Sequence, residues 1–221
     1  MAHTIGDMAT TEATARELRA DAQRNRERII AAAMEVFAER GLDASTAEIA
    51  QRAGVGEATL FRRFPSKDDL VQAIVETQMD KVIAMAADCL TDPDPSEGLE
   101  RFITEMVELS VADRGVMESA KDTCMTHSAL QTRRQEIIDL MTELVKRAQK
   151  VGAVRADLSG QDLGPLINAA ASSAEMPFPG LREDLWKRYL QIILDGLRPE
   201  CASKLRPGPP PRKLFESPEP C

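Results

Sequence analysis

Residues suited to catalysis and metal binding are scarce in this sequence. Its 221 residues include only two histidines and four cysteines, namely His3, His127, Cys89, Cys124, Cys201 and Cys221. The cysteines form no C-x-x-C pair, and Cys124 with His127 lacks the further ligands that a zinc site needs. We therefore predict no metal site and no cofactor. No nucleophile–base constellation or phosphate-binding glycine loop stands out, so an enzyme is the least favoured class.

Long hydrophobic runs and strand-like alternation are also missing. No apolar stretch reaches the roughly 18 residues that cross a membrane, and the N-terminal region lacks the apolar core of a secretory signal. We therefore expect a cytoplasmic protein with reduced cysteines. Hydrophobic residues make up 43% of the chain and recur at intervals of three and four, which favours an all-α fold with a real core.

Charge is distributed unevenly along the chain. The whole sequence carries a net charge of −8, which by itself argues against nucleic acid as a partner. Between Arg24 and Lys67, however, there are eight basic residues and only six acidic ones. A locally basic end on an acidic body is compatible with DNA binding, because the contacts that matter are local.

The basic segment contains a helix-turn-helix pattern. A first helix is predicted over 24–40, and a second begins with capping-box spacing at Ser45 and Glu48. Two glycines in 54–56 indicate a turn, and a third helix over 57–64 has only about two turns. Because so short a helix is unstable alone, we expect the first two helices to hold it in place.

The remainder of the chain is predicted to be helical between two irregular ends. Ser66 caps a fourth helix that runs to about Leu90, and the Asp/Pro-rich stretch 91–96 breaks the pattern and marks a boundary. Further helices are expected over 98–112, 116–125, 129–151, 159–175 and 181–197. We interpret 1–22 as a flexible arm and the Pro-rich residues 199–221 as a disordered tail.

Four short motifs occur together in the N-terminal part of the chain. They are AMEVFAERG at 33–41, TAEIAQRAGV at 46–55, TLFRRF at 59–64 and KDDL at 67–70. In combination they are specific, and the stretch resembles the DNA-binding motif of the tetracycline-repressor (TetR) family of bacterial transcriptional regulators. The resemblance implies an all-α homodimer whose N-terminal three-helix domain binds double-stranded operator DNA.

The same resemblance implies how the domains divide the work. A helix-turn-helix domain would occupy 23–68, and a six-helix ligand-binding and dimerisation domain would occupy 69–198. In such proteins a small-molecule effector in the body changes the separation of the two DNA-reading helices. That separation must match about 34–36 Å, one turn of DNA, for both helices to bind.

The predicted DNA contacts follow from the motif and from the basic residues near it. They are Arg24, Arg26, Thr46, Glu57, Ala58, Thr59, Phe61, Arg62, Arg63 and Lys67. By resemblance, Arg63 faces the groove, where it can pair with guanine, and Thr46 and Lys67 bind phosphates. Phe61 stands where the family usually has a tyrosine, so one phosphate hydrogen bond is absent. For the cations, the alternative is a solvated surface charge.

Two further groups of residues are expected in the body. The candidate ligand contacts are Phe102, Met106, Met117, Met125, His127, Met141 and Asn168, for which ordinary core packing is the alternative. The candidate dimer contacts are Ala170, Ala171, Ala174, Trp186, Tyr189 and Ile193, for which intrachain packing is the alternative. The sequence thus favours a dimeric repressor released by a small, largely apolar ligand. The alternative is a helical binding or adaptor protein that has lost operator recognition.

Overall fold

The structure is a computed structural model, and it describes residues 5–112, 128–175, 184–200 and 202–211. These residues form helices and loops without a strand, so the all-α prediction is confirmed. The chain divides into an N-terminal unit, Met1–Ile74, and a C-terminal unit, Val75–Cys221. The division falls inside a helix, and the break at 91–96 lies within the C-terminal unit.

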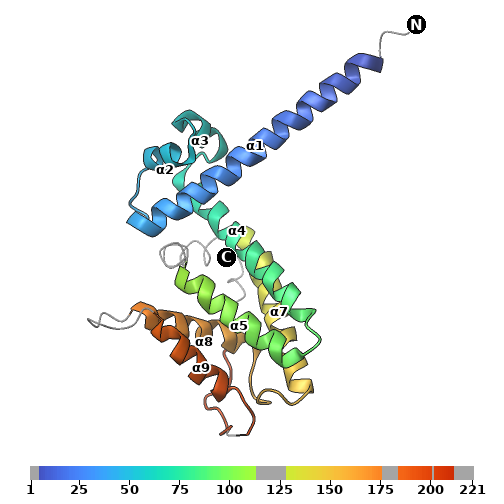
Figure 1. The fold of residues 1–221 in the computed structure, drawn as a ribbon, viewed down its shortest axis with the longest axis vertical. Helices are drawn as coiled ribbons and strands as arrows, with labels where there is room; N and C mark the ends of the chain where they lie inside the picture. Colours follow the sequence, from blue (N-terminus) through green and yellow to red (C-terminus); the bar gives the residue numbers. More distant parts are fainter. Residues whose placement is uncertain (1–4, 113–127, 176–183, 201, 212–221) are drawn as a thin grey trace, which may run out of the picture. The chain divides into compact units, whose positions relative to one another are not determined.

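Three helices and the start of a fourth make up the N-terminal unit. They are α1 (Ile5–Arg40), α2 (Thr46–Ala53), α3 (Glu57–Arg63) and α4 (Lys67–Leu90) (Figure 1). Only the first turns of α4 belong to this unit. Their shared core is apolar, and its fully buried members are Ile29, Ala33, Phe37, Ile49, Leu60, Leu70 and Ile74. The third helix therefore rests on the other helices of the unit, as its short length required.

The first helix begins much earlier than predicted. We expected it to start at Arg24 after a flexible arm, but α1 is helical from Ile5. Residues 7–40 contain no glycine or proline and are rich in alanine, glutamate and arginine, which favour helices. Pairs one turn apart support the helix across the predicted start, such as Gln23 with Glu27 and Arg24 with Asp21. The predicted start at Arg24 was wrong because the residues before it lack the apolar stripe by which amphipathic helices are recognised.

Four further helices of the C-terminal unit pack with the rest of α4. They are α5 (Pro95–Ala112), α7 (Gln131–Lys150), α8 (Gly160–Ser172) and α9 (Leu185–Gly196), with single 3₁₀ turns at Ser128–Leu130 and Ser173–Glu175. α8 contacts α5, α7 and α9, so it forms the centre of the unit. Core side chains include Val82, Phe102, Ile103, Leu144, Leu163, Ile167 and Leu190. The predicted helix over 116–125 lies outside the described residues.

The chain after α9 forms a strap on the body. Residues 202–211, the C-terminal strap, have no helix or strand, as their prolines predict. They are nevertheless attached, because the buried Arg155 guanidinium donates to the Ser203 carbonyl and the Leu205 N–H donates to Asp157 Oδ2 at 3.1 Å. The prediction of a disordered tail is therefore wrong for this segment, and residues 212–221 lie outside the described part of the chain.

Among the helices that the structure describes, none has both the length and the apolar character needed to cross a membrane.

Candidate nucleic-acid interface

The start of α2 is fixed by a complete capping box. The Glu48 N–H donates to Ser45 Oγ at 3.3 Å, and the Ser45 N–H donates back to Glu48 Oε2 at 3.1 Å. This bond from the Ser45 N–H is the main reason that the pKa of Glu48 lies below its ordinary value. The helix ends at Gly54, whose φ of 64° is the left-handed conformation that glycine adopts easily. Both ends confirm the sequence prediction and place the half-buried Thr46 on the first turn.

Several arginines of the basic segment bind partners within the N-terminal unit. Arg28 Nη2 donates to the Ala53 carbonyl at 2.6 Å, so it satisfies the end of α2. Arg52 forms ion pairs from α2 to α1, including one with Glu39 at 2.9 Å. Hydrogen bonding to Arg52 lowers the pKa of Glu39. Arg40 pairs with Glu48, so these three cations hold α2 on α1 and are occupied.

The reading helix α3 shows one inward and one outward face. Leu60 is 1% exposed and anchors it to the core. With about 100° of rotation per residue, Ala58 and Arg62 lie nearly opposite Leu60, whereas Arg63 lies only about 60° from it. Both arginines are exposed, and by helix geometry Arg62 is the one opposite Leu60. Both arginines therefore stay predicted DNA contacts, and Arg62 lies farther from the buried face of α3 than Arg63 does.

The remaining outward side chains of α3 differ in chemistry. The Arg62 guanidinium, a group that can donate hydrogen bonds to bases, donates to Thr59 Oγ1 at 3.0 Å. Phe61 is 43% exposed, an unusual position for a large apolar ring. Glu57 and Ala58 are also exposed at the start of the helix. All five of these residues are among the predicted DNA contacts.

The three remaining predicted contacts have partners inside the unit. Arg24 is exposed and pairs with Asp21. The Arg26 guanidinium lies 5.6 Å from the ring centre of Phe64, and its side chain is half-buried. Lys67, predicted to bind a phosphate, donates two of its three N–H groups to the carbonyls of Leu42 and Ala44.

The predicted ligand contacts are only partly brought together. Phe102 is fully buried in the body core, and Met106 and Met141 pack half-buried against it. Asn168 is exposed on the outer side of α8, so its proposed role as a polar anchor inside the body is wrong. Three other predicted contacts, Met117, Met125 and His127, lie outside the described residues.

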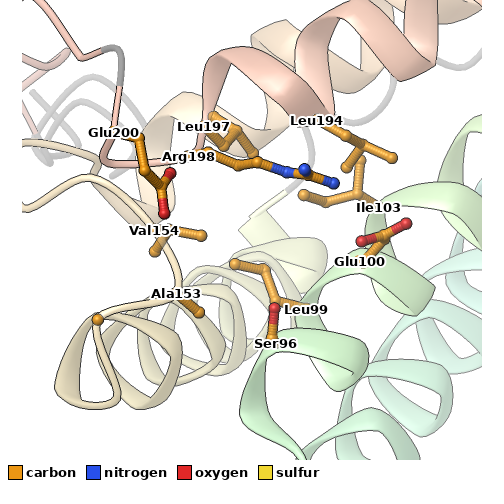
Figure 2. A pocket seen from close by; sticks show the side chains of 11 residues that line it. Ser96, Leu99, Glu100, Ile103, Ala153, Val154, Leu194, Leu197, Arg198 and Glu200 are labelled. Carbon is orange, nitrogen blue, oxygen red and sulfur yellow. The ribbon is translucent and has the colours of Figure 1, made fainter.

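A cavity of about 280 Å³ opens elsewhere in the C-terminal unit (Figure 2). Leu99 and Ile103 of α5 form part of its apolar wall, and Glu100, Arg198 and Glu200 supply charges. None of the predicted ligand contacts lines it. Sequence reasoning missed this cavity, because its walls come from α5, the loop after α7 and the end of α9, which are distant from one another in the chain.

The predicted dimer contacts divide between the core and the surface. Ala170, Ala171 and Trp186 are at most 8% exposed and belong to the core of their own chain, so they are unavailable to a partner. Ala174, Tyr189 and Ile193 are half-buried. Helical rotation explains the error, because only part of a run of small residues can face outward. The exposed residues of the two helices include Pro165, Ala169 and Ser172 of α8 and Ile192 of α9, which is 55% exposed.

Comparisons with known proteins agree with the helix-turn-helix and extend to the body. A family model described as "Bacterial regulatory proteins, tetR family" matches residues 29–74. A second, "Transcriptional regulator SbtR-like, C-terminal domain", matches residues 94–199. The HTH-type transcriptional repressor BepR of Brucella suis is 28% identical over 167 residues, which cover 70% of this chain and 80% of that protein.

Solved structures show the same likeness. The TetR transcription regulatory protein from Mycobacterium vanbaalenii matches with a TM-score of 0.63 and 32% identity, over 82% of this chain and 99% of that one. The TetR transcriptional regulator SCO0520 from Streptomyces coelicolor matches with a TM-score of 0.62 and 29% identity, over 80% and 99% of the two chains. The likeness therefore covers both units rather than the helix-turn-helix alone.

Proposed function

Because the chain belongs to the TetR family of bacterial transcriptional regulators, we propose that this DNA-binding regulator is a repressor which a small, largely apolar ligand releases from its operator. The observation that carries the proposal is the outward face of α3, where Arg62 lies opposite the buried Leu60. A short helix that exposes cations and is held from behind by two other helices suits the major groove. The Brucella suis relative is a transcriptional repressor, which supports the sign of regulation.

Different residues of the N-terminal unit would read bases and position the helix. Arg62 can pair bidentately with guanine, which offers two acceptors in the major groove. Arg63, on the flank of α3, and Thr46, at the capped start of α2, are placed to contact phosphates, which fixes register without reading sequence. Arg24 and Arg26 on α1 are further candidates for backbone contacts. The base-reading inventory of one chain is therefore small.

The small number of base-reading side chains in one chain favours a dimer. Two reading helices one DNA turn apart double the number of contacts and add spacing as a source of specificity. The exposed faces of α8 and α9 are the proposed interface, because Ile192, Ala169 and Pro165 leave apolar surface there. Light scattering on the full chain at micromolar concentration should give about twice the 24.3 kDa chain mass. A mass that stays at 24.3 kDa over the whole concentration range would refute the dimer.

The proposed effector site lies in the helical body. Phe102, Met106 and Met141 supply adaptable apolar surface there, and methionine in particular adjusts to ligands of varied shape. A thermal-shift screen of apolar small molecules provides the measurement, because a ligand of the folded state raises its apparent stability. A stabilising molecule is expected to weaken operator binding. If every stabilising molecule leaves DNA binding unchanged, the release mechanism is wrong.

Fluorescence anisotropy titration tests the DNA-binding role directly. The probe is the DNA that flanks the protein's own gene, and the control is a shuffled duplex of the same composition. We expect affinity in the nanomolar to micromolar range for the flanking DNA and a steep loss with added salt, since phosphate contacts release counterions. Equal and weak binding to both duplexes would contradict operator recognition.

One observation keeps a second function in view, a helical binding or adaptor protein without operator recognition. Arg28, Arg40 and Arg52 have internal partners, which leaves fewer free cations than the sequence suggests. Joint substitution of Arg62 and Arg63 by alanine separates the two functions. An adaptor retains its cellular role in that variant, whereas a repressor loses it.

A further inference from the structure

Another cavity of the C-terminal unit lies between α8, the end of α9 and the C-terminal strap. Its volume is about 440 Å³, within the range of about 300–1,000 Å³ that is usual for small-molecule sites. Pro165 and Leu166 of α8, Ile193 of α9 and residues 205–210 of the strap contribute to its lining. None of the predicted ligand contacts lines it. The cavity is therefore separate from the proposed effector site around Phe102.

The lining of this cavity is mostly apolar and aliphatic. Leu158 and Leu197 are each 6% exposed, and Leu166 and Ile193 are half-buried. Leu205 of the strap is 43% exposed, an unfavourable position for a large apolar side chain. Among the described residues that line the cavity, none is aromatic, so it offers methyl and methylene groups and no ring for stacking. These walls suit an alkyl chain, which would also remove Leu205 from water.

Three charged side chains line the cavity, and two of them are already engaged. The guanidinium of Arg155, which is 8% exposed, donates to both carboxylate oxygens of Asp157. Asp162 Oδ2 accepts the Ser159 N–H at 2.8 Å as part of the cap of α8. Arg206 is exposed and forms no ion pair or hydrogen bond with the described residues. Arg206 is thus the charged group of this lining that is available to a ligand, and a guanidinium pairs well with a carboxylate.

The C-terminal strap is hydrogen-bonded to the body near its start. The Ser203 carbonyl accepts from Arg155, and the Leu205 N–H donates to Asp157 Oδ2 at 3.1 Å. Four of the six residues in 206–211 are prolines, which have no N–H to donate. Within the described part of the chain, no hydrogen bond joins 206–211 to the body. This wall of the cavity is therefore held by packing alone and can adjust to a ligand.

We propose that this cavity binds one aliphatic carboxylate, whose chain lies between α8, α9 and the C-terminal strap and whose carboxylate pairs with Arg206. The apolar walls select the chain, and the available guanidinium selects a negative head group. An alkyl cation of the same length is rejected, because its charge would meet that of Arg206. The proposal goes beyond the proposed repressor function, since it concerns binding by the protein without DNA.

Isothermal titration calorimetry of the full chain without DNA tests the site. We expect decanoate to bind saturably, one molecule per chain, at concentrations below those at which it forms micelles. Acetate, which lacks the chain, and decyltrimethylammonium, which reverses the charge, should not bind. Arg206→Gln should bind decanoate about tenfold more weakly, as for loss of one charged hydrogen bond. Lys204→Gln is the matched control and should bind normally, because Lys204 is an exposed cation of the same strap that does not line the cavity.

Photochemical cross-linking locates the bound chain, because the proposed effector site also accepts apolar molecules. The probe is decanoate with a diazirine in its alkyl chain, and labelled peptides are identified by mass spectrometry. Labels are expected in the peptides that cover 158–166, 193–197 and 205–210. Leu205→Glu should lose these labels, because it replaces an apolar wall and supplies a second carboxylate beside Arg206. Thermal melting followed by circular dichroism verifies that each variant is folded.

Four outcomes would overturn this site. The first is an equal affinity for decanoate in Arg206→Gln and Lys204→Gln. The second is binding of decyltrimethylammonium as tight as that of decanoate. The third is labelling confined to the peptide of α5 that contains Phe102, which would place decanoate in the proposed effector site. The fourth is loss of decanoate binding as the chain dimerises with rising concentration, because a second copy would then fill the cavity. Decanoate binding without any DNA binding would refute the proposed function alone.

Discussion

Arg28, Arg40 and Arg52 bind partners within the N-terminal unit, although each counts among the eight basic residues between Arg24 and Lys67. Lys67 likewise uses two of its three N–H groups on backbone carbonyls. At the scale of the residue, a count of basic side chains therefore overstates the charge that the protein presents to DNA. The outward position of Arg62 is more informative than such a count, because a side chain opposite the buried face of a helix can enter a DNA groove.

Specificity is expected to depend on Arg62 more than on Arg63. Arg62→Ala should lower the ratio of operator affinity to shuffled-DNA affinity by about 10- to 100-fold, which corresponds to about 1–3 kcal/mol for one base contact. Arg63→Ala should weaken both affinities by a similar factor, as loss of a phosphate contact does. Anisotropy titration with both duplexes measures the ratio, and Lys81→Ala, an exposed lysine of the C-terminal unit, is the control. Equal changes of the ratio in the two arginine variants would contradict this assignment.

At the scale of the element, α3 is the weakest helix of the N-terminal unit in its own right. It has seven residues, and its N-cap, Gly56, provides no side-chain hydrogen bond. The helix depends on the anchors Leu60 and Phe64, which are 1% and 3% exposed. Gly56 has a φ of −74° and a ψ of 147°, which is an ordinary N-cap conformation. The backbone is therefore suited to a cap, and only a side-chain acceptor is missing.

Gly56→Ser should stabilise the protein by about 0.5 kcal/mol, by adding a cap and by reducing the freedom of the unfolded chain. A Cβ at this position meets no atom within 4 Å. Urea unfolding of the full chain gives the free energy of unfolding. Gly54→Ser is the matched control, and it should destabilise by more than 1 kcal/mol, because φ is +64° there and the new Cβ would lie 2.8 Å from Arg28 Nη2. A neutral or unfavourable Gly56→Ser would show that α3 is not limited by its cap.

At the scale of the whole molecule, an ion pair attaches the C-terminal strap. Arg155 Nε donates to Asp157 Oδ1 at 2.6 Å, and the Arg155 N–H donates to the Leu197 carbonyl at 2.8 Å. Asp157 also accepts the Leu205 N–H of the strap. Hydrogen bonds from Arg155, followed by that from Leu205, lower the pKa of Asp157 from 3.8 to about 2. The loop before α8, the end of α9 and the strap therefore meet at the Arg155–Asp157 pair.

This carboxylate should make the stability of the body depend on acid pH. A pKa that is lower in the folded state stabilises the fold above pH 3.8, and the stabilisation disappears as the pH falls from 3.8 through about 2. Asp157→Asn should therefore melt at a lower temperature than the wild type at pH 6, and the difference should close over that acid window. Thermal melting from pH 6 to pH 2 provides the measurement, with the exposed Glu200→Gln as control. A difference that stays constant down to pH 2 would exclude the ion pair as its cause.

The sequence alone determined the parts of this protein that depend on neighbours in the chain. The capping box of Ser45 and Glu48 and the turn at 54–56 connect residues only a few positions apart, so the sequence suffices to predict them. The all-α class follows from helical periodicity in the same way, and the motifs over 33–70 indicated the family. The start of α1 was the exception, because good helix formers without an apolar stripe resemble a mobile arm.

The tertiary structure decided which of the predicted residues are free to act. Arg28 and Lys67 find their carbonyl partners 25 and 23 to 25 residues away, and no local pattern encodes such distances. Packing of α8 against α5, α7 and α9 turned Ala170 and Ala171 inward and left Asn168 outside. The sequence therefore set the helices and their ends, whereas the availability of each side chain was set by contacts between helices, because burial and pairing depend on all the elements that meet at one place.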